Sequence, residues 1–153
     1  MNRHVLSEKD SRIFIEQIKK RYGFNIEGKI ELGKDKKERY YFVNDVLAFI
    51  GDELIPTLCA VTKLKLELPY VTIDEGAVRA VANGADLFVP GILEYNCECK
   101  VGDIILVKTK TGLPVAIMKV VMDKKSAIET KKGKFAINLH YVGDKIWEMC
   151  KGK

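Results

Sequence analysis

The spacing of apolar residues predicts a helix at the start of the chain. Apolar side chains that share one helical face recur every four positions, at Phe14, Ile18 and Tyr22. Ser7 and Asp10 resemble a capping box, in which a hydroxyl and an acid satisfy the first amide groups of a helix. Gly23 suits the left-handed position that ends many helices. The pattern therefore predicts a helix over residues 8–22.

Short apolar segments separated by turn residues predict strands in the next part of the chain. The strand candidates are residues 26–32, 39–43 and 46–50. A charged turn over residues 33–38 and the pair Asn44-Asp45 separate them. After Pro56, residues 57–61 fit either a short helix or a strand, and the pattern leaves that choice open.

A second helix is predicted over residues 75–83. Asp74 is a favourable N-cap, and Gly84 stands where a left-handed residue ends many helices. The helical period gives this segment two faces: an apolar one with Ala77, Val78 and Val81, and an outward one with Glu75, Arg79 and Asn83. We therefore expect half of the helix to be buried and half to be displayed to solvent.

Several short strands at regular spacing follow that helix. Turn residues separate the candidates, which are residues 87–89, 104–107, 115–122 and 135–141. Such strands after one short helix are typical of a small closed or partly closed β-barrel. Because the chain changes character near residue 68, we expect an α+β fold of two domains. The first is a small α+β domain over residues 1–68, and the second is a mostly β domain over residues 69–153.

Composition places the chain among globular proteins. It has 153 residues, of which 47% are hydrophobic and 31% are charged. The uninterrupted apolar stretches are far shorter than the roughly 20 residues that a membrane-spanning helix needs, so no membrane span is expected. Charges over residues 8–12 occupy the place where a secretory signal would be apolar. We therefore expect a cytoplasmic protein.

Cysteine chemistry is expected to play no part. The four cysteines are expected to be free thiols, because a cytosolic chain with an adequate core neither needs disulfides nor keeps them oxidised; they are Cys59, Cys97, Cys99 and Cys150. The Cys97-Glu98-Cys99 spacing is compatible with half of a zinc site, but a second close pair of Cys or His is missing. No metal and no cofactor are therefore expected.

The charge pattern permits nucleic-acid binding without requiring it. The net charge is +5, and between residues 119 and 134 six lysines stand against two acids. A solvated hairpin is the simpler interpretation of that segment. Lys119, among the apolar residues 115–121, fits either a snorkelling lysine on an edge strand or a phosphate contact on a rigid strand.

The sequence shows no pattern for catalysis. We find no nucleophile with a base, paired-carboxylate motif, phosphate loop or dinucleotide fingerprint. His4 lies near a terminus that we expect to be frayed, and His140 is expected to pack in a strand near Tyr141 and Trp147. Trp147 is expected to anchor the end of the chain in a core. We therefore expect a protein that is not an enzyme.

Several motifs of the second half resemble the PUA domain. The runs Ile73-Asp74-Glu75-Gly76-Ala77, Asn83-Gly84-Ala85-Asp86 and Pro90-Gly91-Ile92 are similar to the opening of that domain. Val101-Gly102-Asp103 resembles its central part, and His140-Tyr141-Val142-Gly143-Asp144 with Trp147 resembles its end. The resemblance covers about residues 69–150, with the motifs in the same order and spacing.

Residues 1–68 resemble the smaller domain that precedes PUA in the family of malignant T-cell amplified sequence proteins and their archaeal relatives. The motifs are Tyr41 to Asn44 and Ile55-Pro56-Thr57-Leu58. The resemblance implies a mostly β pseudobarrel after an α+β domain, RNA such as tRNA or rRNA as ligand, and a link to translation or the ribosome. Met118 departs from the pattern, because many PUA domains have glycine there, so a close approach to the backbone is expected to be either blocked or differently used.

The displayed face of the helix over residues 75–83 is the predicted RNA site. A glycine just past a helix lets the backbone approach a phosphate, and an arginine beside it can donate two hydrogen bonds to phosphate oxygens. Arg79 also fits a surface ion pair with Glu75. The predicted RNA-contact residues are Arg79, Asn83, Gly84 and Ala85, with Lys119 and Lys134 as secondary candidates.

Three functions compete at this point. The leading hypothesis is a stand-alone RNA-binding protein that recognises a structured or terminal part of tRNA or rRNA. The second is an adaptor in translation, whose N-terminal domain docks a partner such as the ribosome or a translation factor. The third is a part of an RNA-modifying enzyme or its accessory subunit, because PUA domains accompany such enzymes. Catalytic domains of that kind need far more than the first 68 residues.

Overall fold

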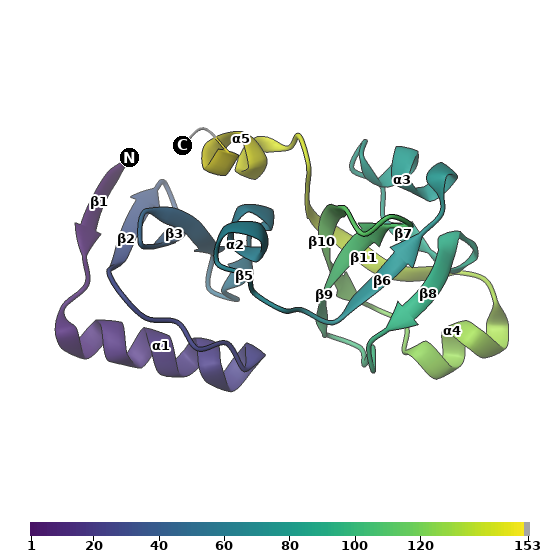
Figure 1. Cartoon of the computed structure of the whole chain (residues 1–153), viewed down its shortest axis with the longest axis horizontal. Helices are drawn as coiled ribbons and strands as arrows, with labels where there is room; N and C mark the ends of the chain where they lie inside the picture. The colour runs from purple at the N-terminus through teal and green to yellow at the C-terminus, as the bar shows by residue number, and fades with distance from the viewer. Residues whose placement is uncertain (152–153) are drawn as a thin grey trace. The chain divides into compact units, whose positions relative to one another are not determined.

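The computed structural model describes residues 1–151 (Figure 1). Its contacts form two compact units: unit 1 comprises residues 1–67 and 149–151, and unit 2 comprises Leu68–Glu148. Each unit combines a sheet with helices, which confirms the expected α+β class. None of the helices within residues 1–151 is long and apolar enough to cross a membrane.

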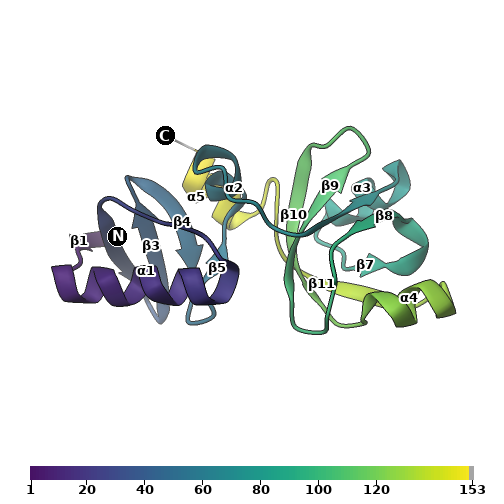
Figure 2. The same cartoon turned by 60° about the horizontal axis from the view of Figure 1, so that its bottom comes forward.

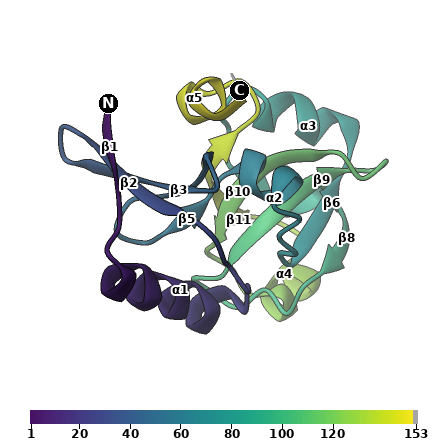
Figure 3. The same ribbon diagram turned by 60° about the vertical axis from the view of Figure 1, so that its left-hand side comes forward.

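Unit 1 is built on a five-stranded antiparallel sheet. The strands lie in the order β1 (Asn2–Val5), β2 (Ile30–Asp35), β3 (Glu38–Val43), β4 (Val46–Ile50) and β5 (Ile55–Pro56). Helix α1 (Glu8–Tyr22) lies along this sheet (Figure 3). Its buried Phe14 stacks on Tyr41 with ring centroids 4.6 Å apart and meets Phe49 edge-on at 5.9 Å. These aromatic contacts fix the helix on the sheet.

The predicted first helix is confirmed at both ends. The Ser7 hydroxyl accepts a hydrogen bond from the Asp10 amide at 3.1 Å, and Gly23 is left-handed at φ 79°. The open choice at residues 57–61 is decided for a helix, α2 (Leu58–Lys63). Thr57 caps α2 by accepting from the Ala60 amide at 3.0 Å, and its own hydroxyl donates to the Leu47 carbonyl at 2.6 Å.

Two expectations for unit 1 are wrong. The N-terminus is not frayed, because β1 pairs with β2 and places His4 opposite Leu32. The strand expected from residue 26 begins only at Ile30, because the Asn44 side chain holds the preceding residues in a loop. Its Oδ1 accepts from the Lys29 amide at 2.9 Å, and its Nδ2 donates to the residue-27 carbonyl at 3.2 Å. Asparagine commonly forms such local backbone contacts, which compete with strand pairing.

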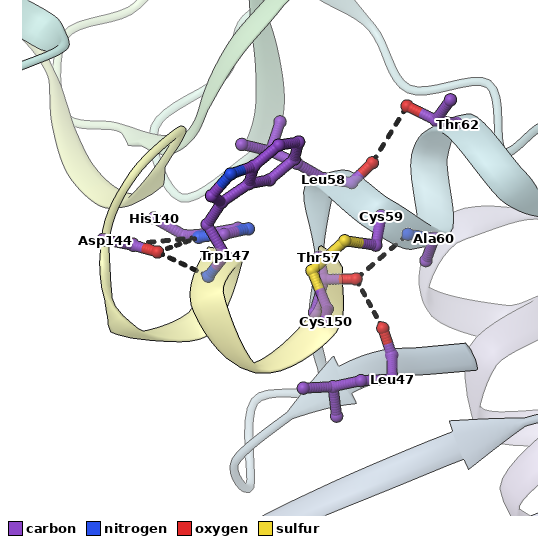
Figure 4. Close-up of a disulfide and its surroundings, with 10 residues drawn as sticks. All are labelled: Leu47, Thr57, Leu58, Cys59, Ala60, Thr62, His140, Asp144, Trp147 and Cys150. Atoms are coloured by element: carbon purple, nitrogen blue, oxygen red, sulfur yellow. Dashed lines mark hydrogen bonds and ion pairs between the residues drawn. A yellow bond between two sulfur atoms is a disulfide. The ribbon is translucent and has the colours of Figure 1, made fainter. Parts of the chain in front are cut away.

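The expectation of free thiols is also wrong. Cys59 in α2 is joined to Cys150 by a disulfide with a Cα–Cα distance of 6.1 Å, and both residues are buried (Figure 4). Cys97 and Cys99 form a second disulfide with a Cα–Cα distance of 5.1 Å. The prediction rested on the cellular compartment, whereas proximity in the fold decides which sulfurs meet. Two positions 91 residues apart give no local pattern that would reveal their pairing.

Unit 2 is built on a six-stranded mixed sheet that curls into a half-barrel. This agrees with the predicted partly closed barrel. The strands lie in the order β7 (Leu87–Phe88), β11 (Lys134–Tyr141), β10 (Pro114–Val120), β9 (Ile104–Thr109), β6 (Tyr70–Ile73) and β8 (Ile92–Asn96). Strands β6 and β9 are parallel, and every other neighbouring pair is antiparallel. Fully buried side chains such as Ile105, Met118 and Phe135 fill its core.

Short helical segments connect strands of unit 2. Helix α3 (Glu75–Val81) follows β6, a 3-10 turn η1 (Val89–Gly91) follows β7, and α4 (Lys124–Thr130) joins β10 to β11 (Figure 2). Helix α4 replaces the solvated hairpin that we expected from the lysine-rich segment. Asp123 begins α4 by accepting from the Ser126 amide at 2.8 Å, a cap that charge counting ignores. The edge-strand interpretation of Lys119 is likewise wrong, because β10 pairs on both sides.

The end of the chain passes from unit 2 to unit 1. Helix α5 (Lys145–Lys151) begins in unit 2, and its last residues group with unit 1, where Cys150 is bonded to Cys59. The predicted second domain over residues 69–153 therefore differs from the contact grouping at its C-terminal end. That the chain folds as two independent domains with a boundary near residue 68 stays a prediction.

Candidate nucleic-acid interface

Helix α3 forms where its caps predict it, and it is two residues shorter than expected. Asp74 accepts from the Ala77 amide at 2.8 Å, while the Asp74 amide donates to the Gly91 carbonyl at 2.9 Å. The helix ends at Val81, and Gly84 is left-handed at φ 91°. The backbone after the helix thus turns sharply into residues 83–86, which we call the α3 loop.

The outward face of α3 carries the predicted polar residues, all exposed: Glu75, Arg79 and Asn83. Within residues 1–151, no carboxylate lies in ion-pairing contact with Arg79, so the alternative interpretation of Arg79 as an ion pair with Glu75 is wrong. Asn83 follows the helix, and its Nδ2 donates to the Arg79 carbonyl at 3.1 Å. The guanidinium of Arg79 is therefore available to an anion from solvent.

Arg79 borders a groove of about 600 Å³ between α3 and the turn at residues 109–113. Apolar side chains on the groove walls include Ile73, Val78, Leu93 and Leu113. In the turn, the hydroxyls of Thr109 and Thr111 lie 3.0 Å apart, and the Leu113 amide donates to Thr109 Oγ1 at 3.0 Å. Arg79 thus stands at the edge of a hollow that is apolar inside and polar at its rim.

A second, smaller groove of about 280 Å³ lies on the other side of α3. It is bordered by the helix at Ala77 and Ala80 and by the segment that holds Phe88 and Pro90. Gly91 permits this close approach, because a Cβ there would lie 2.7 Å from the Cβ of Ala77. Helix α3 is therefore flanked by grooves on both sides, and the α3 loop lies at its end.

Strand β11 holds the α3 loop in place. The side-chain Nδ2 of Asn138 donates to the carbonyls of Val81 at 3.3 Å and Ala85 at 3.0 Å. The Asn138 amide also donates to Asp86 Oδ1 at 2.8 Å. A Cβ at Gly84 would lie 3.3 Å from atoms of the Tyr141 ring, so this ring closes the space beneath the loop. The loop is thus anchored by side chains that sequence reasoning missed.

The backbone amides of Asn83, Gly84 and Ala85 are already used inside the protein. The amides of Asn83 and Ala85 donate to the Ala80 carbonyl at 3.0 and 3.1 Å, and the Gly84 amide donates to the Val81 carbonyl at 2.9 Å. They cannot also bind a phosphate. The loop can offer an RNA its bare Gly84 surface and its side chains, so direct anion contacts fall to Arg79 and Asn83.

The two lysine candidates differ in position. Lys134 lies beside the α3 loop, because its Nζ is 2.9 Å from Asp86 Oδ2. The pKa of Asp86 is lowered, first by the hydrogen bond from the Asn138 amide and then by Lys134. Lys119 is half-buried in β10 opposite Ile137, and strand β11 separates β10 from β7. The structure brings Lys134 to the loop, and it places Lys119 one strand further away.

Met118 lies inside the half-barrel. It is fully buried between Ile105 of β9 and Asn138 of β11 in the strand register. Its side chain fills the core and does not cover the outer surface of β10. The methionine that departs from the PUA pattern is therefore a packing residue.

His140 is buried, as the sequence predicts. Its Nδ1 lies 2.9 Å and 3.0 Å from the two carboxylate oxygens of Asp144 (Figure 4). Burial lowers the pKa of His140, and the carboxylate of Asp144 opposes that shift. Asp144 also accepts from the amides of Tyr141 at 2.9 Å and Trp147 at 2.8 Å, which fixes the turn before α5. This cluster explains the local structure without a ligand.

Comparison with known proteins places these features in a family. A sequence profile described as a domain of unknown function (DUF1947) matches residues 2–64, and the PUA domain profile matches residues 69–142. An uncharacterized protein of Methanocaldococcus jannaschii is 33% identical, with 95% of this chain and 94% of that protein covered. Translation machinery-associated protein 20 of Saccharomyces cerevisiae is 30% identical over 77% of this chain and 71% of its own length. The chain belongs to this family of PUA-domain proteins.

A solved structure of the family confirms the fold. A conserved PUA domain protein from Thermoplasma acidophilum superposes with a TM-score of 0.84 at 31% identity, covering 97% of this chain and 99% of that one. A probable tRNA pseudouridine synthase B of Pyrococcus abyssi is 42% identical, but the match covers only 43% of this chain and 20% of the enzyme. The similarity to this enzyme is thus limited to the PUA region.

Proposed function

We propose that this protein binds structured RNA, such as tRNA or rRNA, through α3 and the α3 loop, in cytoplasmic work connected with translation. The observation that carries the proposal is the geometry around Arg79. An exposed guanidinium, without a carboxylate partner within residues 1–151, stands on a helix that is flanked by two grooves and followed by a left-handed glycine. Membership of the PUA family and the translation-associated relative support the same function.

Each predicted residue has a distinct role in this proposal. Arg79 donates to phosphate oxygens, and Asn83 beside it can donate or accept at a phosphate or a ribose hydroxyl. Gly84 and Ala85 present a surface without bulky side chains, so that the RNA backbone can come close to the protein. Lys134 neutralises Asp86 next to the loop, so that this acid does not repel a phosphate, and Lys119 places an ammonium group further along the sheet.

The adaptor hypothesis makes a different prediction. If the main partner were a protein, such as a ribosomal protein or translation factor docked on unit 1, its capture from a cell lysate would survive nuclease treatment. If RNA is the ligand, nuclease removes the captured material. No catalytic step is part of the proposal, because the enzyme relative shares only the PUA region with this chain.

The salt dependence of RNA binding tests the proposal. With about four phosphate contacts, raising monovalent salt from roughly 50 to 200 mM is expected to weaken binding about 50- to 150-fold. Fluorescence anisotropy with a labelled tRNA measures this slope. The absence of binding at low salt, or an affinity that ignores salt, would contradict RNA binding through charged contacts.

A further inference from the structure

The charges of unit 2 are unevenly distributed. The segment over residues 119–134 holds six lysines and two acids, a net charge of +4. The rest of Leu68–Glu148 holds five cations and eight acids, a net charge of −3. Of the two acids in the basic segment, Asp123 is hydrogen-bonded at the start of α4, and this bond lowers its pKa. Unit 2 therefore presents one strongly basic region, at α4 and the turn that follows it.

The turn after α4 is held in a fixed conformation. Lys131 is left-handed at φ 59°, and Gly133 follows at φ 100°. The Thr130 hydroxyl lies 2.8 Å from the Ser126 carbonyl and 3.2 Å from the Lys132 carbonyl, which ties the turn to the helix. Lys131 and Lys132 are exposed, and neither pairs with an acid in the described part of the chain. Their ammonium groups thus project from an ordered backbone.

Phe88 lies next to this turn. The Val89 amide donates to the Gly133 carbonyl at 2.9 Å, and Phe88 is paired with Lys134 in the register of β7 and β11. Phe88 is 51% exposed. Among the large apolar side chains that are exposed within residues 1–151, it is the only aromatic one. The Lys134 ammonium lies 6.0 Å from the centre of its ring. An exposed ring therefore stands between the basic turn and the smaller groove beside α3.

We infer that Phe88 stacks on an unpaired base of the bound RNA while Lys131 and Lys132 contact its neighbouring phosphates. Aromatic rings in basic surroundings bind single-stranded nucleotides in this way, since every base has a face that can stack. Asp86, which borders the same smaller groove as Phe88, is neutralised by Lys134 and does not repel the strand. This inference rests on the proposed RNA binding, and it adds that the RNA carries a single-stranded segment.

The test uses an RNA hairpin with a short single-stranded 3′ tail, and the same hairpin without the tail. Phe88→Ala and Phe88→Leu are expected to weaken binding of the tailed RNA about 5- to 150-fold, the range for loss of one stacked base. Phe88→Tyr keeps a ring and is expected to retain the affinity. Binding of the blunt hairpin should change little in all three variants. A 2-aminopurine in the tail should lose fluorescence on binding to the parent and not to Phe88→Leu.

The lysines have a matched control in unit 1. Lys36 and Lys37 are an exposed pair in which the first residue is also left-handed at φ 59°. The double change Lys131→Gln with Lys132→Gln should reduce the salt slope by about 1.4–1.8, the value for two lost phosphate contacts. The same double change at residues 36 and 37 should leave the slope unaltered. An equal effect of both pairs would mean that only net charge matters, and it would overturn the assignment.

The outcomes separate this inference from the proposed function. If the parent binds neither RNA, the proposed function fails and the stacking site fails with it. If the parent binds and Phe88→Leu binds the tailed RNA equally well, RNA binding stands and the stacking site is wrong. Equal weakening of tailed and blunt RNA by Phe88→Leu would also overturn the stacking site. So would a pull-down in which Phe88→Leu keeps its RNA and loses only a protein partner whose capture survives nuclease treatment.

Discussion

The α3 loop should tolerate no side chain at Gly84, and the structure separates two reasons for this. Gly84 is left-handed at φ 91°, a conformation that costs an alanine about 1–2 kcal/mol. A Cβ there would also lie 3.3 Å from the Tyr141 ring, and overpacking of this kind costs about 1 kcal/mol more. We expect Gly84→Ala to lower the free energy of unfolding by about 2–3 kcal/mol.

Gly102 provides the matched control for this prediction. Its φ is 95°, but nothing lies within 4 Å of a Cβ placed there. Gly102→Ala should therefore show the backbone cost alone, about 1–2 kcal/mol. Urea unfolding followed by the fluorescence of Trp147, the single tryptophan of the chain, measures both variants. Tyr141→Leu removes the ring that a Cβ at Gly84 would meet. When Gly84→Ala is made in a Tyr141→Leu background, it should therefore cost about 1 kcal/mol less than it does in the parent, which is the cost of Gly102→Ala. A Gly84→Ala protein as stable as the parent would refute the left-handed geometry of the loop.

Three further predictions follow from the contacts described above. Asn138→Ala removes the donor to two loop carbonyls and should destabilise the protein by about 1–3 kcal/mol in urea unfolding; an unchanged free energy of unfolding would contradict this role of Asn138. Cys59→Ser removes the disulfide to Cys150, which joins positions 91 residues apart, and should lower the free energy of unfolding by up to about 4 kcal/mol without reductant. With reductant, parent and variant should melt alike. Burial lowers the pKa of His140, so the unfolded state takes up the proton of this histidine before the folded state does as pH falls. The free energy of unfolding should therefore decline from about pH 6.5 downward. An equal decline in His140→Asn would contradict this.

Local signals sufficed where the chain determines its own conformation. The helix α1 has a hydroxyl cap, an apolar face and a terminal glycine within one segment, and the structure reproduces its bounds. Asp74 likewise marked the start of α3, because capping depends on residues a few positions apart, whereas the helix ends at Val81, two residues before the end that Gly84 suggested. The resemblance to the PUA domain placed these elements in the right family and fold class.

Contacts between distant residues lay beyond this reasoning. Asn138 and Tyr141 support the α3 loop from β11, more than 50 residues away, and nothing in their local pattern announces it. An asparagine inside a strand was the available signal, because strands are poor in this residue. Phe88 was predicted only as part of a strand over residues 87–89, and that pattern does not show that β7 is a short edge strand that leaves its ring exposed.

Charge counting also misjudged the basic segment. Six lysines suggested a solvated hairpin, yet Asp123 caps a helix there and Ala127 is buried in the core. A polar majority does not exclude a helix, because one small apolar residue can anchor it against the sheet. The fold then places Lys134 at the α3 loop through Asp86, a contact that the sequence separation concealed.

The affinity of Arg79→Ala for structured RNA tests the central claim most directly. Arg79 is exposed and makes no ion pair in the described part of the chain, and alanine favours helices, so the melting temperature should hardly change. Anisotropy titration with a labelled tRNA should show affinity lower by about ten- to a hundred-fold, equivalent to roughly 1.5–3 kcal/mol for a charge-assisted contact. A variant that melts normally and binds RNA as tightly as the parent would show that the α3 face is not the RNA site.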